Sequence, residues 1–463
     1  MIEKRQPIVT VLGHVDHGKT TLLDNLRKTK IVDREAGGIT QSIGASIVQT
    51  EGGQKITFID TPGHAAFSGM RSRGAKVADI AVLVVAADDG VKPQTKEAIG
   101  FIQEANIPFI VALTKTDLPS ANVQNALATL ETEGIYFEGR GGNTPYVEVS
   151  ARQNVGVDKL LELIVLVSDI NDILADADAP LEAVVIETGK DQRGALATVV
   201  VRNGKLEVGK LINAAGQEAK VRGLFDHQNK SVKKINPGEP ALILGFDAVP
   251  QIGVVIEDAG KDKKVNAFVE QRVVTKGKML EGQLPLVLKT QNAGALEALL
   301  ASIPEGVFVV SASVGDINEN DIFLARTSGA KIFAFEVKVN NQIAKLAETE
   351  KVEVKSFKII YDLTDRINEL IKAGTKVIVA KMVVIATFPF NNKIVAGCRL
   401  ELGQVSKGNK LILVRDEKDV AEVRVTSVRR GKDELTTVTE GEFGAILEPQ
   451  LDFTIGDVLI SRA

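Results

Sequence analysis

Residues Gly13-His14-Val15-Asp16-His17-Gly18-Lys19-Thr20 have the spacing Gly-x-x-x-x-Gly-Lys-Thr, and Thr21 follows them. The stretch lies between an apolar run at residues 8–12, which predicts a buried strand, and a helix-like segment at residues 20–30. Its glycines let backbone N–H groups turn toward an anion, and the helix N-terminus adds a positive partial charge. In this arrangement Lys19 reaches the β and γ phosphates of a nucleotide, and the Thr20 hydroxyl binds Mg²⁺. The stretch therefore predicts a P-loop in an α/β domain.

A second set of polar residues follows the P-loop. The apolar run at residues 56–59 leads to Asp60-Thr61-Pro62-Gly63-His64, so a carboxylate stands at a strand end, where doubly wound folds bind ligands. We expect Asp60 to hold Mg²⁺, and the backbone N–H of Gly63 to approach the γ phosphate because no side chain blocks it. Thr40, the one hydroxyl of residues 35–41, is expected to join Mg²⁺ and the γ phosphate.

Two later strand ends predict which base is bound. Residues 109–113 lead to Thr114-Lys115-Thr116-Asp117, and the Asp117 carboxylate can accept hydrogen bonds from N1 and N2 of guanine, a donor pair that adenine lacks. Residues 146–149 lead to Ser150 and Ala151, which are placed to close over the base, while Arg152 is expected at the surface. These elements together predict a site for GTP and GDP with Mg²⁺.

Composition excludes several other classes of protein. The chain has 463 residues, 44% of them hydrophobic, and a formal charge of −4, which gives no global reason to expect nucleic acid binding. Cys398 is the sole cysteine, so an internal disulfide is excluded, and four histidines do not suggest a Cys/His metal site. No apolar run reaches the roughly 18 residues of a membrane span, and no secretory pattern precedes the first strand. We expect a cytoplasmic protein without a membrane partner.

An internal repeat organises the rest of the chain. Gly204 and Gly209 stand five residues apart among short alternating strands, and Gly403 and Gly408 repeat that step. This pattern predicts two small β-barrels that arose by duplication. Between them, strand and helix patterns alternate, which predicts a small parallel α/β domain. The predicted domains are a P-loop GTPase domain (residues 1–174), a β-barrel (181–262), a linker with a small parallel α/β domain (263–374) and a second β-barrel (375–463).

The motifs resemble those of the translational GTPases, and most closely those of the initiation factor 2 family, over nearly the whole chain. Residues 13–20, 35–41 and 58–67 carry the resemblance, the middle one through Glu-Ala-Gly-Gly-Ile-Thr-Gln. It implies that His64 orients the attacking water, while Lys19 and Gly63 stabilise the γ phosphate. It also implies a cytoplasmic monomer that acts with the small and large ribosomal subunits, initiator tRNA and other initiation factors.

The resemblance extends to the last barrel, where Cys398 and Arg430 match motifs that receive the formylated methionine end of initiator tRNA. Residues 423–432 contain four cations and no acid, which suits an acceptor stem but also a solvated strand. Two residues depart from the family pattern: Gly431 replaces a frequent phenylalanine, and Phe443 replaces a second cysteine.

Further departures leave alternatives open. Thr114 stands where the family's guanine motif usually has asparagine, and the long N-terminal extension of bacterial members has no counterpart in this sequence. An elongation-type carrier of aminoacyl-tRNA is one alternative, although the α/β domain before the last barrel argues against it. A ribosome-binding scaffold that holds GTP without hydrolysing it is another, and His64, Thr40 and Gly63 argue against that. The amphipathic segment at residues 359–374 predicts a helix, which either transmits motion from the nucleotide site to the last barrel or packs on its own domain.

Overall fold

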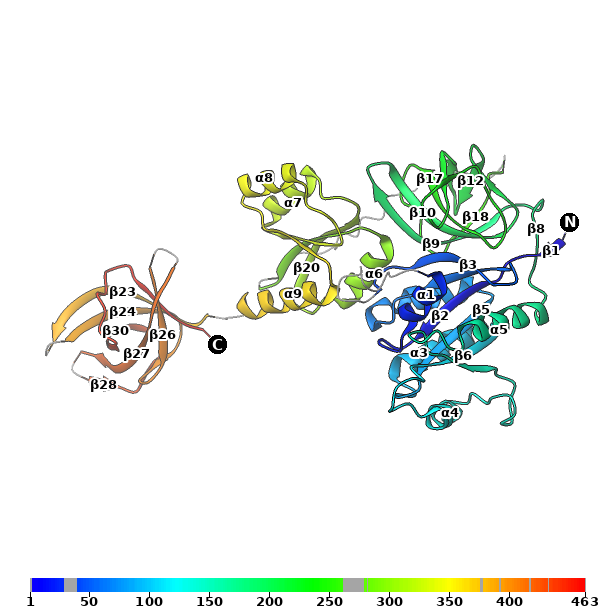
Figure 1. Cartoon of the computed structure of the whole chain (residues 1–463). Helices are drawn as coiled ribbons and strands as arrows, with labels where there is room; N and C mark the ends of the chain where they lie inside the picture. Colours follow the sequence, from blue (N-terminus) through cyan, green and yellow to red (C-terminus); the bar gives the residue numbers. More distant parts are fainter. Residues whose placement is uncertain are drawn as a thin grey trace. The chain divides into compact units, whose positions relative to one another are not determined.

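The computed structural model describes residues 2–462, except 29–39, 261–278, 281, 375–377, 391–392, 416–417 and 432. These residues form two compact units, Met1–Ile367 and Asn368–Ala463 (Figure 1). The glycine-rich residues 35–39 of the predicted nucleotide site and most of the linker predicted after residue 262 lie outside the described residues.

No helix in the described part of the chain is both long and apolar enough to cross a membrane.

The first domain is built on a six-stranded sheet. All neighbouring strands are parallel except the edge strand β3, which runs antiparallel to β4. The strand order is β3 (Gly44–Gln49), β4 (Lys55–Asp60), β2 (Ile8–Gly13), β5 (Ile80–Ala86), β6 (Phe109–Thr114) and β7 (Tyr146–Glu148). Strands β2 and β5 are buried throughout and rich in Val, Ile and Leu, as expected for a parallel sheet covered on both faces.

Helices cover both faces of this sheet. One apolar core contains residues of α1 and α5, and a second contains residues of α2, α3 and α4. The helices are α1 (Lys19–Arg27), α2 (Ser68–Val77), α3 (Pro93–Ala105), α4 (Val123–Thr132) and α5 (Val157–Ile170). The expected doubly wound architecture is confirmed, and it brings the carboxyl ends of β2, β4 and β6 to one edge.

The last helix of the first domain ends four residues before the predicted domain boundary at residue 174. Helix α5 stops at Ile170, and the chain passes through Asp172 with φ 45°, in the left-handed region that ends helices. Strand β8 (Leu174–Asp176) follows and pairs antiparallel with β1 (Ile2–Lys4). The residues between the first two predicted domains therefore include part of a strand that pairs with residues 2–4.

An antiparallel β-domain comes next, as predicted. Its main sheet contains β9 (Glu182–Asp191), β10 (Gly194–Asn203), β12 (Leu211–Ala214), β13 (Gln217–Lys220), β14 (Gly223–Phe225), β15 (Ser231–Val232), β17 (Pro240–Phe246) and β18 (Val255–Asp258). A two-stranded ribbon, β11 (Leu206–Glu207) with β16 (Lys234–Ile235), accompanies it.

The predicted small parallel α/β domain is also confirmed. Its strands lie in the order β20-β19-β21-β22, with every pair parallel. The elements are β19 (Leu284–Thr290), α6 (Ala293–Ser302), β20 (Val307–Val314), α7 (Glu319–Ser328), β21 (Lys331–Phe335), α8 (Asn341–Thr349) and β22 (Val354–Phe357), after which α9 (Ile360–Gly374) begins.

The second unit contains a closed β-barrel. Its sheet closes because β26 pairs with both β31 and β27. The strands are β23 (Ile378–Phe390), β24 (Lys393–Gly403), β25 (Val405–Ser406), β26 (Lys410–Arg415), β27 (Lys418–Arg430), β28 (Asp433–Leu435), β29 (Thr437–Val438), β30 (Gly441–Glu448) and β31 (Val458–Arg462). Closure removes the unpaired edges that an open sheet would expose.

The two β-domains repeat each other in detail. Gly209 and Gly408 have φ angles of 92° and 93°, which favour glycine, and each donates its N–H to a valine carbonyl, Val221 at 2.8 Å and Val425 at 2.7 Å. A second pair of repeat glycines makes matching bonds, Gly253 N to Val185 O at 2.8 Å and Gly456 N to Val384 O at 2.9 Å. These shared turn geometries support the duplication inferred from the sequence.

Candidate active site

A cavity of about 430 Å³ opens at the edge where the P-loop and the strand ends meet. Most of its lining residues were expected from the sequence; the lining is Val15, Asp16, Gly18, Lys19, Thr20, Thr21, Thr40, Gly63, His64, Thr114, Lys115, Asp117, Leu118, Ala151, Arg152 and Tyr361. Five residues predicted for the nucleotide site are not part of that lining: Gly13, His14, His17, Asp60 and Ser150. Tyr361 was not predicted there and comes from α9, and Arg152 lines the cavity while remaining exposed.

The first glycine of the loop serves the sheet rather than the ligand. Gly13 ends β2 with φ 151°, and a Cβ at this position would lie 2.3 Å from the carbonyl oxygen of Val84 on β5. Only glycine therefore lets the two strands approach here. Gly18 has φ 86° and caps the N-terminus of α1, whose backbone N–H groups face the loop.

Lys19 is the buried cation of the loop. Its side chain is 6% exposed, and its Nζ donates a 2.5 Å hydrogen bond to the carbonyl of His14. Burial lowers the pKa of Lys19 from 10.5 to about 8, an effect opposed by the carboxylate of Asp60. Anionic oxygens in the cavity would offset this loss of hydration, so the site is chemically suited to phosphate.

Two hydroxyls and a carboxylate gather beside the lysine. The Oγ1 atoms of Thr20 and Thr40 are 3.0 Å apart. Asp60 is 5% exposed, its Oδ1 has no hydrogen-bond partner among the described residues, and its Oδ2 lies 3.6 Å from the Arg27 guanidinium. Burial raises the pKa of Asp60, although Arg27 and Lys19 oppose the shift. This oxygen set suits Mg²⁺, which usually takes one or two protein ligands beside phosphate oxygens and water.

Within the described residues, no three His, Cys, Asp or Glu side chains converge on a metal site.

His64 lines the cavity with a neutral imidazole. It caps the short helix η2 (Ala65–Phe67), where its Nδ1 accepts a 3.1 Å hydrogen bond from Ala66 N. Burial, and then the nearby Arg71, lower the pKa of His64 below 6.5. An imidazole whose Nδ1 accepts carries its proton on Nε2, by assignment from this hydrogen bond. Nε2 is then a donor to an oxygen in the cavity.

Arg71 holds the backbone around His64 and was not predicted from the sequence. This α2 residue has no exposed surface, and its Nη1 donates to the carbonyls of Pro62, at 3.1 Å, and of His64. Its Nη2 pairs with Glu97 on α3 at 2.6 Å. Glu97 also accepts a hydrogen bond from Ser68 at 2.5 Å. A basic residue in a helix ordinarily suggests a surface position, so no local signal marked Arg71 as buried.

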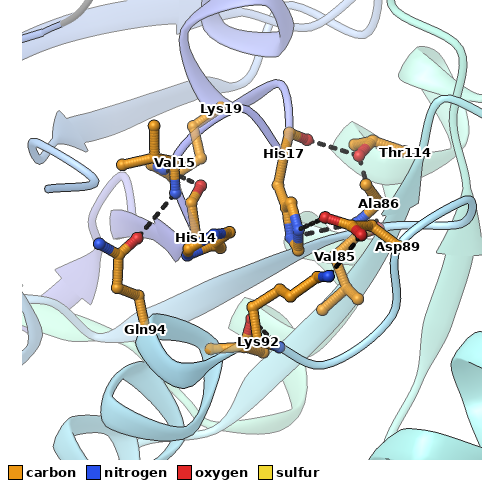
Figure 2. Close-up of polar contacts among 11 residues, drawn as sticks. His14, Val15, His17, Lys19, Val85, Ala86, Asp89, Lys92, Gln94 and Thr114 are labelled. Atoms are coloured by element: carbon orange, nitrogen blue, oxygen red, sulfur yellow. Dashed lines mark hydrogen bonds and ion pairs between the residues drawn. The ribbon is translucent and has the colours of Figure 1, made fainter.

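The side chain of His17 anchors the P-loop to the residues at the end of β5. It is fully buried, its Nδ1 accepts from Ala86 N at 3.3 Å, and its Nε2 lies 3.3 Å from Asp89, which Lys92 also pairs with at 2.6 Å (Figure 2). Burial lowers the pKa of His17 to about 4, so the ring is neutral at pH 7. His17 therefore contributes its backbone to the loop, and its ring is structural.

Thr114 contacts the P-loop through its side chain. Its hydroxyl donates a 2.6 Å hydrogen bond to the carbonyl of His17, as Figure 2 shows, and so links the end of β6 to the P-loop. On the opposite side of the loop, Gln94 Oε1 accepts from Val15 N at 2.9 Å. The P-loop is therefore held by side chains from two elements, the end of β6 and the start of α3.

The far end of the cavity carries the predicted base-binding groups. Ser150 Oγ donates to Asp117 Oδ1 at 2.7 Å, which orients the carboxylate, and Asp117 itself lines the cavity. Asn25 on α1 donates to the carbonyl of Ala151 at 2.8 Å and fixes that loop. Ser150 does not line the cavity itself but orients Asp117 through this hydrogen bond. The spacing of the two residues in the sequence does not predict that contact.

The two predicted tRNA-binding residues lie in different surroundings of the second unit. Cys398 is fully buried among the core residues of the barrel, and burial raises the pKa of its thiol to about 12. Arg430 is exposed and donates to the carbonyl of Glu440. Its neighbour Arg429 lies 3.9 Å from Glu434 on β28, so acids of the next strand reduce the positive charge that β27 alone suggested. Lys432 lies outside the described residues.

Three family models match successive parts of the chain. Residues 4–169 match the elongation factor Tu GTP binding domain, residues 180–259 match elongation factor G domain 2, and residues 257–368 match translation-initiation factor 2. A solved structure, GDP-bound aIF5B from Aeropyrum pernix, is 25% identical with a TM-score of 0.48, over 99% of this chain and 92% of that chain.

Curated relatives carry one description. Translation initiation factor IF-2 of Caldanaerobacter subterraneus subsp. tengcongensis is 40% identical over 99% of this chain and 69% of its own length. Translation initiation factor IF-2 of Hyphomonas neptunium is 39% identical over 98% of this chain, which spans 58% of that relative. With the P-loop, the strand-end motifs and the order of domains described above, these matches show that the chain belongs to the translation initiation factor IF-2 family and carries its GTP-binding domain.

Proposed function

We propose that the chain is a ribosome-stimulated GTPase that acts as an initiation factor in the cytoplasm. It binds initiator tRNA, places it on the small ribosomal subunit, promotes joining of the large subunit and leaves after hydrolysis. The observation that supports this proposal is that Lys19, His64 and Asp117 line one cavity, where they would bind the phosphates, the attacking water and the guanine base respectively. The GTPase, β-barrel, α/β and tRNA-binding parts are divided near residues 174, 262 and 374.

Binding would use both ends of the cavity. Lys19 and the backbone of the P-loop would hold the β and γ phosphates, and Asp117 would accept hydrogen bonds from guanine N1 and N2. Lys115 would flank the base, and Ala151 would offer its backbone, as the resemblance implies. Mg²⁺, held by Thr20, Thr40 and Asp60, would neutralise charge on the β and γ phosphates.

Hydrolysis would consist mainly of positioning and charge stabilisation. Water attacks the γ phosphorus in line, the bond to the β–γ bridging oxygen breaks, and GDP and inorganic phosphate leave. His64 would hold the water through Nε2, the Gly63 N–H would bind a γ oxygen, and Lys19 would stabilise charge on the transferring group. Arg71 holds the carbonyls of Pro62 and His64, and we assign the final placement of the imidazole to contact with the ribosome.

A His64→Ala variant tests the hydrolysis proposal. We expect GTP affinity within about twofold of the original chain, while ribosome-stimulated turnover falls by about a hundredfold or more, as for a lost general-base or water-positioning group. The matched control is His227→Ala, a histidine of the β-domain outside the cavity, which should leave turnover unchanged. Equal turnover in the His64→Ala variant and the original chain would remove His64 from the mechanism and favour a non-hydrolysing scaffold.

The tRNA proposal rests on the last barrel. Arg430 presents its guanidinium to solvent and would contact the acceptor stem, while the buried Cys398 would shape the floor of a pocket for formylmethionine. We expect tighter binding of formylmethionyl initiator tRNA than of unformylated initiator or an elongator aminoacyl-tRNA. Arg430→Ala should weaken binding, whereas Lys410→Ala, which removes a cation that is 75% exposed on β26, should not. Equal binding of all three tRNAs would assign the barrel another role.

A further inference from the structure

The start of α9 is anchored to the segment that precedes β3. Gln41 is 4% exposed, its Nε2 donates to the carbonyl of Lys358 at 2.8 Å, and its Oε1 accepts from Ile360 N at 3.1 Å. A single amide thus satisfies one acceptor and one donor at the N-terminus of this helix, where backbone N–H groups lack partners within the helix. Because Gln41 follows Thr40 directly, the start of α9 is fixed relative to the predicted Mg²⁺ ligand.

One residue further along, the helix reaches His64. The ring of Tyr361 packs edge-to-face against the imidazole, with ring centroids 4.4 Å apart and planes at 85°. Tyr361 also lines the cavity. The other aromatic neighbour of His64, Phe67, lies farther away, with centroids 6.4 Å apart. Tyr361 is therefore the close aromatic contact of this imidazole in the described part of the chain.

The contact supplies a restraint that the hydrogen bond of His64 does not. The bond from Ala66 N to Nδ1 fixes one edge of the imidazole, but the ring can still tilt about that edge. A ring packed at right angles limits this tilt, because edge-to-face pairs have a preferred geometry. The direction of Nε2 then depends on where α9 begins, and Gln41 sets that position.

We propose that Tyr361 is a positioning residue that holds the His64 imidazole in the orientation needed for GTP hydrolysis, with Gln41 fixing the start of α9 so that it can do so. This inference rests on the proposed hydrolytic role of His64. The first turn of α9 thereby completes an active site whose other groups all come from the first domain.

The test measures ribosome-stimulated GTP turnover and GTP affinity separately, on the full chain. Tyr361→Ala should lower kcat by about two- to tenfold, the range expected for loss of one aromatic pair, with the Kd for GTP unchanged. Tyr361→Phe keeps the ring and should restore kcat. Gln41→Ala should lower kcat in the same way, because it frees the start of α9.

A double mutant distinguishes a positioning role of Tyr361 from a general structural effect on kcat. In a His64→Ala background, Tyr361→Ala should cause no further loss, because the group that it positions is gone. Tyr136→Ala, which removes a tyrosine that is 54% exposed elsewhere in the first domain, is the matched control and should leave kcat unchanged. An undiminished kcat in Tyr361→Ala, an equal loss in the His64→Ala background, or a failed rescue by phenylalanine would overturn the proposal.

Failure of the proposed function has a different signature. It would show as a His64→Ala variant with full turnover, or as no stimulated turnover in the original chain, and the positioning role would fall with it. Loss in His64→Ala together with full turnover in Tyr361→Ala would remove the positioning role alone.

Discussion

Arg71 is predicted to be the residue on which the local stability of the His64 loop depends most. Replacing it with methionine keeps much of the volume but removes the donors to the carbonyls of Pro62 and His64 and the ion pair with Glu97. Each charged hydrogen bond to a buried carbonyl contributes about 1.5 kcal/mol, and the pair with the partly exposed Glu97 about 1 kcal/mol. Arg71→Met should therefore lower the local free energy of opening by about 4 kcal/mol.

Hydrogen exchange at the amides of Ala66 and Phe67 measures this opening directly, because both amides donate to groups of His64. A loss of about 4 kcal/mol corresponds to a fall in protection of up to about a thousandfold. We also expect GTP turnover to fall, since the His64 backbone loses its support.

The matched control for Arg71 is Lys76→Met, because Lys76 also joins α2 to α3, through a 2.9 Å pair with Glu104, but both side chains are more than half exposed. Such a pair contributes at most about 1 kcal/mol. Protection within about threefold of the original chain in Arg71→Met, or an equal loss in Lys76→Met, would refute the assignment.

Three further outcomes follow from buried groups. Thr114→Val leaves the carbonyl of His17 without its 2.6 Å donor and should raise the Kd for GDP about tenfold in a fluorescence titration, whereas Thr116→Val should not. Burial raises the pKa of Glu187 from 4.5 to about 7, so the folded chain keeps a proton that the unfolded chain releases between these values, and stability from this group is lost as pH rises. In calorimetry, the melting temperature of the Glu187→Gln variant relative to the original chain should therefore increase from pH 5 to pH 8. A difference in melting temperature that stays constant over this range would contradict the prediction. The buried thiol of Cys398 should resist a disulfide reagent at pH 8 until denaturant is added, and reaction of the native protein at the rate of a free thiol would show an open barrel.

Much of the nucleotide site could be predicted because its groups stand at the ends of strands in short, ordered motifs. A parallel sheet brings such ends to one edge, so the spacing around Lys19, Gly63 and Asp117 was enough to place them in one cavity. The roles of the outer residues were harder to infer. Gly13 and His17 belong to the loop motif, yet the first serves a close approach of strands and the second supports the loop from a buried position.

Contacts between distant segments were not predictable from local pattern. The bonds from Gln41 to the start of α9 join residues more than three hundred positions apart. Glu434 on β28 lies opposite Arg429 on β27, and this pairing could likewise not be predicted from the sequence of β27 alone. Both depend on how elements meet in space, which neither periodicity nor motif spacing encodes.

The anchoring of α9 by Gln41 has a consequence for the synthesis of the protein. At about 5–20 residues per second, the roughly 319 residues between Gln41 and Ile360 take about 15–60 s to translate. During that time the first domain can fold and bind nucleotide, because its sheet and P-loop are complete. The ring that packs on His64 has not yet been made. A nascent chain is therefore expected to bind GTP before it can hydrolyse GTP at the full rate.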